Sequence, residues 1–324
     1  MTMDAGYYLD SFLAPLAHHL ASDDLTDLFV NRAGEIWTER LGGRMQRVEE
    51  PALDEKLLER LARQVAAASA QGINRSHPLL AATLPDGSRV QIVAPPATRK
   101  GHVLAIRKHV SADLSLADWE DGEAFAAAGK SSIDLEKDRT FRAVSGREVR
   151  PALAEAVVSR KNILVSGGTS SGKTTFLNAL LKEIPQDERL LLIEDTAELV
   201  VTQPNTVGLI AARDDLSEAE VSAEDLLIAA LRMRPDRIIL GELRGCEAFT
   251  FLRAVNTGHP GSMTSIHADT PHRAIEQLAL LVLQAGSRLS RDDVRHYVRE
   301  SIDVFVQLER RGGRRRAAEV LVAD

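Results

Sequence analysis

One eight-residue segment constrains the fold of this chain more than any other feature. Residues 167–174 read Gly-Gly-Thr-Ser-Ser-Gly-Lys-Thr and match the pattern G-x-x-x-x-G-K-[ST]. An apolar run at residues 162–165 precedes the segment and predicts a buried strand, and a helical pattern follows it as far as Glu183. A strand, a glycine-rich loop and a helix in this order are typical of a phosphate-binding loop, or P-loop. A chance glycine turn at a helix start is the alternative, and the flanking elements disfavour it.

The residue types in this loop indicate how it would bind a nucleotide. Glycines let successive backbone N–H groups point at phosphate oxygens, and the helix N-terminus adds a favourable dipole. We expect Lys173 to reach the β- and γ-phosphates and the Thr174 hydroxyl to ligate Mg²⁺, so ATP and Mg²⁺ are the predicted cofactors. The predicted nucleotide-binding residues of this segment are Gly167, Gly168, Thr169, Ser170, Ser171, Gly172, Lys173, Thr174 and Thr175.

Carboxylates follow two further predicted strands. The buried run Arg237–Leu240 leads into Gly241-Glu242, where a P-loop sheet needs an acidic group near the metal and the attacking water. Glu198 closes an acidic cluster that follows the predicted strand Leu190–Ile193. Consecutive strands of a doubly wound sheet end on the same side, so both carboxylates can face one γ-phosphate. The alternative is that single members of the cluster are solvated turn acids.

The order of the patterns predicts two domains. Residues 1–110 read as a helix, a hairpin, a second helix and three strands, which is typical of a small α+β domain. Residues 111–145 are acidic and lack a sustained period, and we interpret them as a linker. Residues 146–324 alternate strands and helices, which predicts a parallel α/β sheet closed by a C-terminal hairpin around Gly312-Gly313. Ser222 and Asp225 predict a capping box at the start of a helix in this domain.

The composition limits the setting in which the chain works. Cys246 is the single cysteine, which excludes an internal disulfide framework and favours a reducing, cytoplasmic setting. Residues 1–20 lack the basic start and apolar core of a signal peptide, and no run approaches the ~20 apolar residues of a membrane-spanning helix. A formal net charge of −7 argues against a protein that grips nucleic acid along a whole face.

Four segments together resemble the motifs of the secretion ATPase superfamily. They are the P-loop and residues 193–199, 231–245 and 258–269, which resemble the Walker A, Asp-box, Walker B and His-box motifs. The arginine-rich approach to Glu242 and the Gly-His-Pro-Gly start of residues 258–269 look most like the branch of type IV secretion and conjugation. A single cysteine cannot make the tetracysteine zinc module that is frequent in the type II branch. The resemblance is strong over residues 160–275 and looser over residues 1–110.

This resemblance implies a RecA-like P-loop NTPase domain at the C-terminus, an N-terminal α+β domain, and roles for particular residues. Glu198 matches the catalytic glutamate of the Asp box, Glu242 the Walker B glutamate, and His267 the histidine that senses the γ-phosphate. The residue directly before Glu242 is Gly241 and not an Asp, a feature that the family shares. Whether Glu242 contacts the metal directly is therefore left open. The implied catalytic residues are Lys173, Glu198, Glu242 and His267, and the further implied nucleotide contacts are Arg89, Arg107 and Arg234.

The resemblance also implies a hexameric ring whose N-terminal domains close and open as ATP binds and is hydrolysed. Inner-membrane proteins of a secretion system are the implied partners, and the implied location is the cytoplasm, with peripheral contact at the cytoplasmic face of the inner membrane. A nucleic-acid-translocating RecA-like ATPase and a nucleotide-gated scaffold are the alternatives. The acidic balance speaks against nucleic acid as a direct ligand.

Three other features have competing interpretations. His267, Asp269 and His272 can each coordinate a divalent ion, although their spacing does not put all three on one face. The arginines at 310–316 could contact nucleic acid, but they flank a Gly-Gly turn, where charges are usually solvated. Trp37 and Trp119 are isolated, which favours packing over base stacking.

Overall fold

The structure, a computed structural model, describes most of the chain. The described residues are 4–40, 43–69, 71–108, 113–126, 128, 140–211 and 221–323. They form two compact units, one within residues 4–108 and one from residue 113 to residue 323. One hydrophobic cluster fills the core of the first unit and two clusters fill that of the second.

The first unit is an antiparallel sheet with two helices, as the sequence predicts. The strand order is β3-β2-β1-β6-β5-β4. Helix α2 buries Leu58, Leu61, Ala62, Val65 and Ala66, the spacing of one helical face. The backbone N–H of Leu57 donates to Asp54 at 2.7 Å, which caps this helix. The elements are α1 (Asp4–Leu20), β1 (Leu25–Arg32), β2 (Glu35–Arg40), β3 (Gln46–Glu49), α2 (Glu55–Ala68), β4 (Leu79–Thr83), β5 (Arg89–Val93) and β6 (Val103–Arg107).

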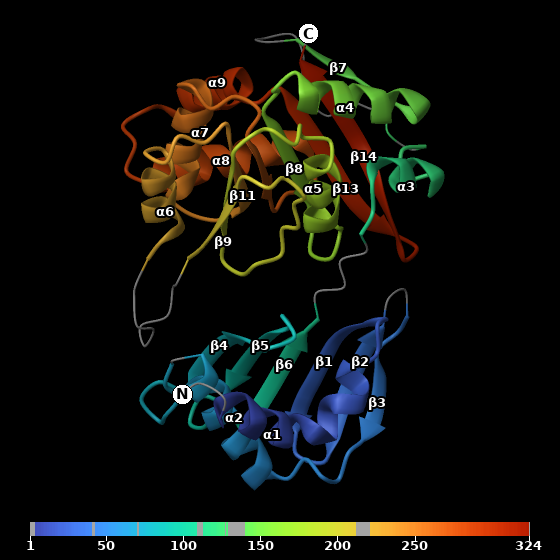
Figure 1. The fold of residues 1–324 in the computed structure, drawn as a ribbon, viewed down its shortest axis with the longest axis vertical. Helices are drawn as coiled ribbons and strands as arrows, with labels where there is room; N and C mark the ends of the chain where they lie inside the picture. Colours follow the sequence, from blue (N-terminus) through green and yellow to red (C-terminus); the bar gives the residue numbers. More distant parts are fainter. Residues whose placement is uncertain are drawn as a thin grey trace. The chain divides into compact units, whose positions relative to one another are not determined.

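The second unit is an α/β unit around an eight-stranded sheet with the order β10-β9-β11-β12-β8-β13-β14-β7 (Figure 1). The strands from β10 to β13 pair in parallel, and β14 and β7 close the sheet antiparallel. The elements up to β10 are α3 (Leu116–Asp121), β7 (Phe141–Ala143), the 3-10 turn Gly146–Glu148, α4 (Val149–Val158), β8 (Ile163–Gly167), α5 (Lys173–Leu181), β9 (Leu190–Glu194) and β10 (Thr206–Ile210). The remaining elements are α6 (Ala223–Ala230), β11 (Arg237–Leu243), α7 (Glu247–Asn256), β12 (Met263–Ile266), α8 (Pro271–Gln284), α9 (Arg291–Ser301), β13 (Val304–Arg311) and β14 (Arg314–Ala323).

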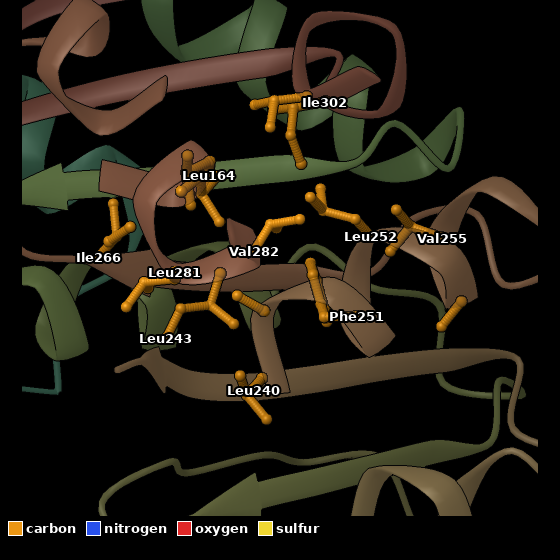
Figure 2. Packing of buried hydrophobic residues seen from close by; sticks show 14 of the residues in the cluster. Leu164, Leu240, Leu243, Phe251, Leu252, Val255, Ile266, Leu281, Val282 and Ile302 are labelled. Atoms are coloured by element: carbon orange, nitrogen blue, oxygen red, sulfur yellow. The ribbon is translucent and has the colours of Figure 1, made fainter. Parts of the chain in front are cut away.

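Helices cover both faces of this sheet. In β8, Ile163 and Val165 join the cluster formed with α3, α4 and α5, whereas Leu164 joins the cluster formed with α6 to α9. Figure 2 shows Leu164 and Leu240 in the latter cluster with Phe251. Since both faces are buried, the strands read in the sequence as continuous apolar runs.

Part of the segment interpreted as a linker packs on the second unit. Leu116, Trp119 and Phe125 are buried there, and the ring of Trp119 meets that of Phe176 edge-on at 4.9 Å between centroids. These apolar residues are too few and too irregularly spaced to form a period, which is why the sequence pattern does not reveal them. The packing role expected for Trp119 is confirmed.

Local predictions in the second unit agree with the structure. Ser222 and Asp225 form the predicted capping box at α6, and β13 and β14 form the predicted hairpin around Gly312-Gly313. In the part of the chain that the structure describes, none of the helices has the length and apolar character needed to cross a membrane.

Candidate active site

The glycine-rich segment connects β8 to α5, as predicted. Strand β8 ends at Gly167 and α5 begins at Lys173. Gly172 has a φ of 97° and Ser170 a φ of 59°, so the loop turns through the left-handed region twice. A Cβ at Gly172 would lie 2.8 Å from Cδ of Arg315, and the φ of 97° is one that L side chains rarely adopt, so both observations favour glycine at this position. The loop therefore has the strand-loop-helix geometry that a phosphate-binding loop requires.

The ends of four parallel strands bring the predicted catalytic residues together. Strands β9, β11, β12 and β8 are neighbours in the sheet, so their carboxyl ends lie along one edge. Oε1 of Glu242, in β11, lies 3.6 Å from Nζ of Lys173 and 3.3 Å from Nε2 of His267. Lys173 and His267 are 94 positions apart in the sequence, and Nζ and Nε2 are 3.3 Å apart.

Lys173 is buried at the centre of this cluster. Its Nζ donates to the carbonyl of Gly167 at 3.0 Å and lies 3.4 Å from the carbonyl of Gly168. Burial lowers the pKa of Lys173, and the nearby carboxylate of Glu242 opposes that shift. A buried ammonium with a single close carboxylate is well suited to a polyanionic ligand such as a triphosphate.

Glu198 and Thr174 form a second contact at the same edge. The Thr174 hydroxyl donates to Oε2 of Glu198 at 3.1 Å, which leaves its oxygen lone pairs available for a metal ion. Together with Glu242, these residues supply a hydroxyl and carboxylates, the oxygen donors that Mg²⁺ prefers when phosphates and waters complete its shell. The residues present therefore fit Mg²⁺ held between Thr174 and a bound nucleotide.

Glu194 holds the loop that carries Glu198, a role that sequence reasoning missed. Oε1 of Glu194 accepts hydrogen bonds from the backbone N–H groups of Glu198 at 2.7 Å and Leu199 at 2.8 Å. Glu194 is 7% exposed and ends the buried strand β9. The available signal was its position directly after an apolar run, since a carboxylate there is buried unless it has partners.

Arg244 joins two acidic residues, and sequence reasoning assigned it no role. Its Nε donates to Oε2 of Glu242 at 2.6 Å and its Nη1 donates to Oδ2 of Asp195 at 2.9 Å. Burial works to lower the pKa of Arg244, but Glu242 and then Asp195 outweigh it, so the pKa is raised. The arginine thus orients the carboxylate of Glu242 from the side opposite Lys173.

His267 lies at the end of β12 with a lowered pKa. Partial burial is the largest cause, and the positive charge of Lys173 adds to it. The imidazole is therefore neutral at neutral pH, with one ring nitrogen as a donor and the other as an acceptor.

Of the three predicted arginines, one belongs to the second unit and lies outside this cluster, and two belong to the first unit. Arg234 is exposed and precedes the amino end of β11, whereas Glu242 is near the carboxyl end, roughly 15 to 20 Å away along the strand. Arg89 and Arg107 belong to the first unit, where they are direct cross-strand partners in β5 and β6. Nε of Arg107 donates to Oδ1 of Asp27 at 3.0 Å.

The alternative metal interpretation finds no support in the contacts. Nη1 of Arg273 donates to Oδ2 of Asp269 at 2.9 Å, and Nε2 of His272 lies 3.9 Å from Oε1 of Glu276. Across the described residues there is no group of three or more His, Cys, Asp or Glu side chains that could hold a metal ion. Asp269 thus pairs with Arg273 in the first turn of α8, and His272 lies near Glu276 on the same helix.

Comparisons with known proteins agree with the resemblance seen in the motifs. Residues 133–311 match the model of a family described as "Type II/IV secretion system protein". The chain is 40% identical to the type IV secretion system protein VirB11 of Bartonella henselae, over 95% of this chain and 91% of that protein. It is 39% identical to the type IV secretion system protein PtlH of Bordetella pertussis, over 98% of this chain and 95% of that protein.

Solved structures support the fold. The pilus retraction motor PilT with bound ADP has a TM-score of 0.61 and 19% identity, and the match covers 98% of this chain and 83% of that one. The predicted fold class, a RecA-like P-loop NTPase domain with an N-terminal α+β domain, is confirmed. The predicted resemblance to type IV secretion proteins is confirmed as well.

Proposed function

Because the chain belongs to the family of type II/IV secretion system proteins, we propose that it is an ATPase that powers assembly of, or substrate transfer through, a type IV secretion system. The observation that carries the proposal is the meeting of Lys173, Glu242 and His267, with 3.3 to 3.6 Å between their charged or polar atoms, beside a P-loop. An ammonium, a carboxylate and a neutral imidazole at one strand edge match the needs of phosphoryl transfer to water.

The proposed chemistry is attack of water on the γ-phosphate of ATP. Lys173 neutralises charge on the β- and γ-phosphates, and Thr174 would hold Mg²⁺, which would supply further charge neutralisation when bound. Glu242 and Glu198 orient the attacking water and the waters around the metal, and one of them accepts its proton. His267 donates a hydrogen bond to the γ-phosphate and so distinguishes ATP from ADP. Positioning and charge neutralisation supply most of the rate enhancement.

Arg89 and Arg107 are proposed to bind the phosphates from the N-terminal domain. Arg89 and Arg107 lie directly opposite each other on neighbouring strands, so a bound polyanion could meet both guanidinium groups, of which that of Arg107 also pairs with Asp27. Their planar guanidinium groups suit bidentate contact with phosphate oxygens. Binding of the γ-phosphate would then favour a closed arrangement of the domains, and hydrolysis would release it.

The proposal extends to the assembly. The chain forms a hexameric ring. Arg234 lies before the amino end of β11, whereas the P-loop follows the carboxyl end of β8, so in this ring Arg234 contacts the nucleotide of a neighbouring copy. The ring works in the cytoplasm at the inner membrane, where membrane-embedded proteins of the secretion system are its partners.

Release of inorganic phosphate by the purified full chain with Mg-ATP tests the proposed activity. Lys173→Ala should abolish turnover, because an ammonium that faces two phosphates in a partly dry site contributes several kcal/mol to transition-state binding. Lys182→Ala, at the end of the same helix, where the side chain pairs with Asp113, is the matched control and should retain activity. Turnover of Lys173→Ala within about tenfold of the parent would show that this loop is not catalytic.

The same assay distinguishes a secretion motor from the alternative, a nucleic-acid-translocating ATPase. Single-stranded DNA added across a range of salt concentrations should leave the turnover unchanged. Strong stimulation that falls steeply with salt would favour a nucleic-acid translocase over a secretion motor.

A further inference from the structure

Arg315, in the C-terminal hairpin, lies against the P-loop. Its Cδ is 2.8 Å and its Nε 3.4 Å from the position that a Cβ would take at Gly172. Its Nη1 donates to the hydroxyl of Thr175, in the first turn of α5, at 3.4 Å. Cη2 of Trp119 lies 3.4 Å from that same Cβ position. The stem of Arg315 thus occupies the space that a side chain at Gly172 would fill, in the vicinity of Trp119.

Arg315 differs from two other arginines of this unit in the partners of its guanidinium group. Arg316 pairs with Glu309 at 2.5 Å, and Arg244 pairs with Glu242 and Asp195. For Arg315, the one hydrogen-bond partner within the described residues is the neutral hydroxyl of Thr175. Burial is the first cause that lowers the pKa of Arg315, and the charge of Arg310 is the second. Among the described residues no carboxylate pairs with this half-buried guanidinium, and such a group costs free energy unless an anion binds there.

The position of Thr175 indicates which part of a nucleotide would meet Arg315. Along the first turn of α5, Lys173 is the residue type that reaches the β- and γ-phosphates, and Thr174 is the type that ligates Mg²⁺. The backbone N–H groups of this loop and helix start cradle the α- and β-phosphates. Thr175 is one residue further along the helix, away from the tip of Lys173, so its neighbour Arg315 lies toward the α-phosphate.

We propose that Arg315 is a nucleotide-binding residue that contacts the α-phosphate, the part that ATP and ADP share. The inference rests on the proposed function, since it assumes that the P-loop binds a nucleotide. It differs in its consequence from the roles of Lys173, Glu242 and His267, which meet the γ-phosphate end. Arg315 should hold the nucleotide equally before and after hydrolysis, and so keep ADP bound once phosphate has left.

Calorimetric titration of the full chain with Mg-ADP and with a non-hydrolysable Mg-ATP analogue tests this role. Arg315→Met keeps an apolar stem against Gly172 and removes the charge. It should weaken both ligands by the same factor, about 10- to 100-fold, the range for loss of a charge-assisted hydrogen bond. Arg314→Met is the matched control, because Arg314 is exposed and adjacent strand residues point to opposite faces; it should bind both ligands within about twofold of the parent.

Three results would overturn the inference. The first is binding of ADP by Arg315→Met within about twofold of the parent while Lys173→Ala weakens it, which would leave the proposed function intact. The second is a loss confined to the ATP analogue, which would place Arg315 at the γ-phosphate. The third is a loss for ADP that differs from the loss for GDP, which would indicate contact with the base. If the parent binds no nucleotide at all, the proposed function and this inference both fail.

A folding control accompanies the titration. The far-UV circular dichroism spectrum of Arg315→Met, recorded without denaturant, should match that of the parent. If that variant does not fold, Arg315→Lys replaces it. A point charge without the planar fork should then give a smaller loss, equal for ADP and the ATP analogue, and no loss would contradict the proposal.

Discussion

The strand edge of the second unit and the arginine pair of the first unit gather charge in different ways. Parallel strand ends bring Lys173 next to Glu242 and His267, so opposite charges meet and largely neutralise each other. An antiparallel register puts Arg89 opposite Arg107, so two guanidinium groups face each other, with Asp27 pairing with that of Arg107. The difference is that the second unit brings oppositely charged side chains together at one strand edge, which suits the proposed reaction site, whereas the first unit brings two guanidinium groups together, which suits the proposed contact with phosphates.

The largest expected effect is a loss of stability at the buried ion pair that anchors the start of β11. Arg237 begins β11 and is 0% exposed; its Nε and Nη2 donate to Glu188 at 2.6 and 2.8 Å, and its Nη1 donates to the carbonyl of Val157 at 2.7 Å. Glu188→Ala should lower the free energy of unfolding by about 3 to 5 kcal/mol, because it leaves a buried guanidinium without its carboxylate. Urea unfolding of the second unit, followed by Trp119 fluorescence in a Trp37→Phe background, measures the change.

A matched control for the buried ion pair is available at the neighbouring position. Asp187→Ala, at an exposed neighbouring position, should change the free energy of unfolding by less than about 0.5 kcal/mol. The double variant Glu188→Leu, Arg237→Met should recover much of the loss, since replacing both partners removes the uncompensated charge. A loss below about 1 kcal/mol for Glu188→Ala would mean that the ion pair does not hold β11 in place.

The next largest effect comes from a variant that removes a charge from the proposed reaction site and keeps the shape of the side chain. Glu242→Gln should retain binding of ATP and slow hydrolysis by about 100-fold or more, because the amide keeps the size of the side chain and loses the charge that orders metal and water. Single-turnover hydrolysis and a binding titration separate the two quantities. Glu198→Gln should also be slow. If Glu198→Gln matches the parent while Glu242→Gln is severely impaired, Glu242 alone orients the water.

The sequence predicts those parts of this site that local pattern determines. The P-loop, the carboxylate after Arg237–Leu240 and the histidine of residues 258–269 are each marked by a motif at a strand end. Parallel strands put their carboxyl ends at one edge of the sheet, and the parallel direction follows from the alternation of strands and helices, whereas the order of the strands does not. The α+β character of residues 1–110 is likewise readable from period and turn signals.

Other parts of the site depend on contacts that no motif encodes. Glu194 accepts hydrogen bonds from backbone N–H groups of the loop that follows its own strand, and Arg244 reaches Asp195 after the neighbouring strand β9, so both roles depend on the three-dimensional arrangement. Arg315 reaches the P-loop from a hairpin 143 positions after Gly172 in the numbering, and its run of arginines looks like a solvated turn. The contacts of Trp119 are equally long-range, which is why a segment with no period still packs on a core.

A smaller effect is expected for the pKa of His267, which reports on the electrostatics of the strand edge in the second unit. His267 should titrate below its ordinary pKa of 6.5, because it is partly buried and Lys173 is close. As pH falls below 6.5, the unfolded chain binds this proton before the folded chain does, so the folded state loses stability in that window. Histidine NMR titration, assigned with His267→Gln, measures the midpoint. Lys173→Met should raise it, and a midpoint at or above 6.5 in the parent would contradict the arrangement.

The central claim is that the nucleotide is bound by the reaction site of the second unit and by the arginine pair of the first. The most direct test is the affinity of the full-length double variant Arg89→Ala, Arg107→Ala for Mg-ADP and for a non-hydrolysable Mg-ATP analogue. Arg63→Ala, an exposed arginine paired with Glu59 at 2.7 Å in the same unit, is the control. The account predicts that the double variant loses about tenfold or more affinity for the analogue and clearly less for ADP, because the γ-phosphate brings the extra charge. Affinities for both ligands equal to those of the parent would contradict it.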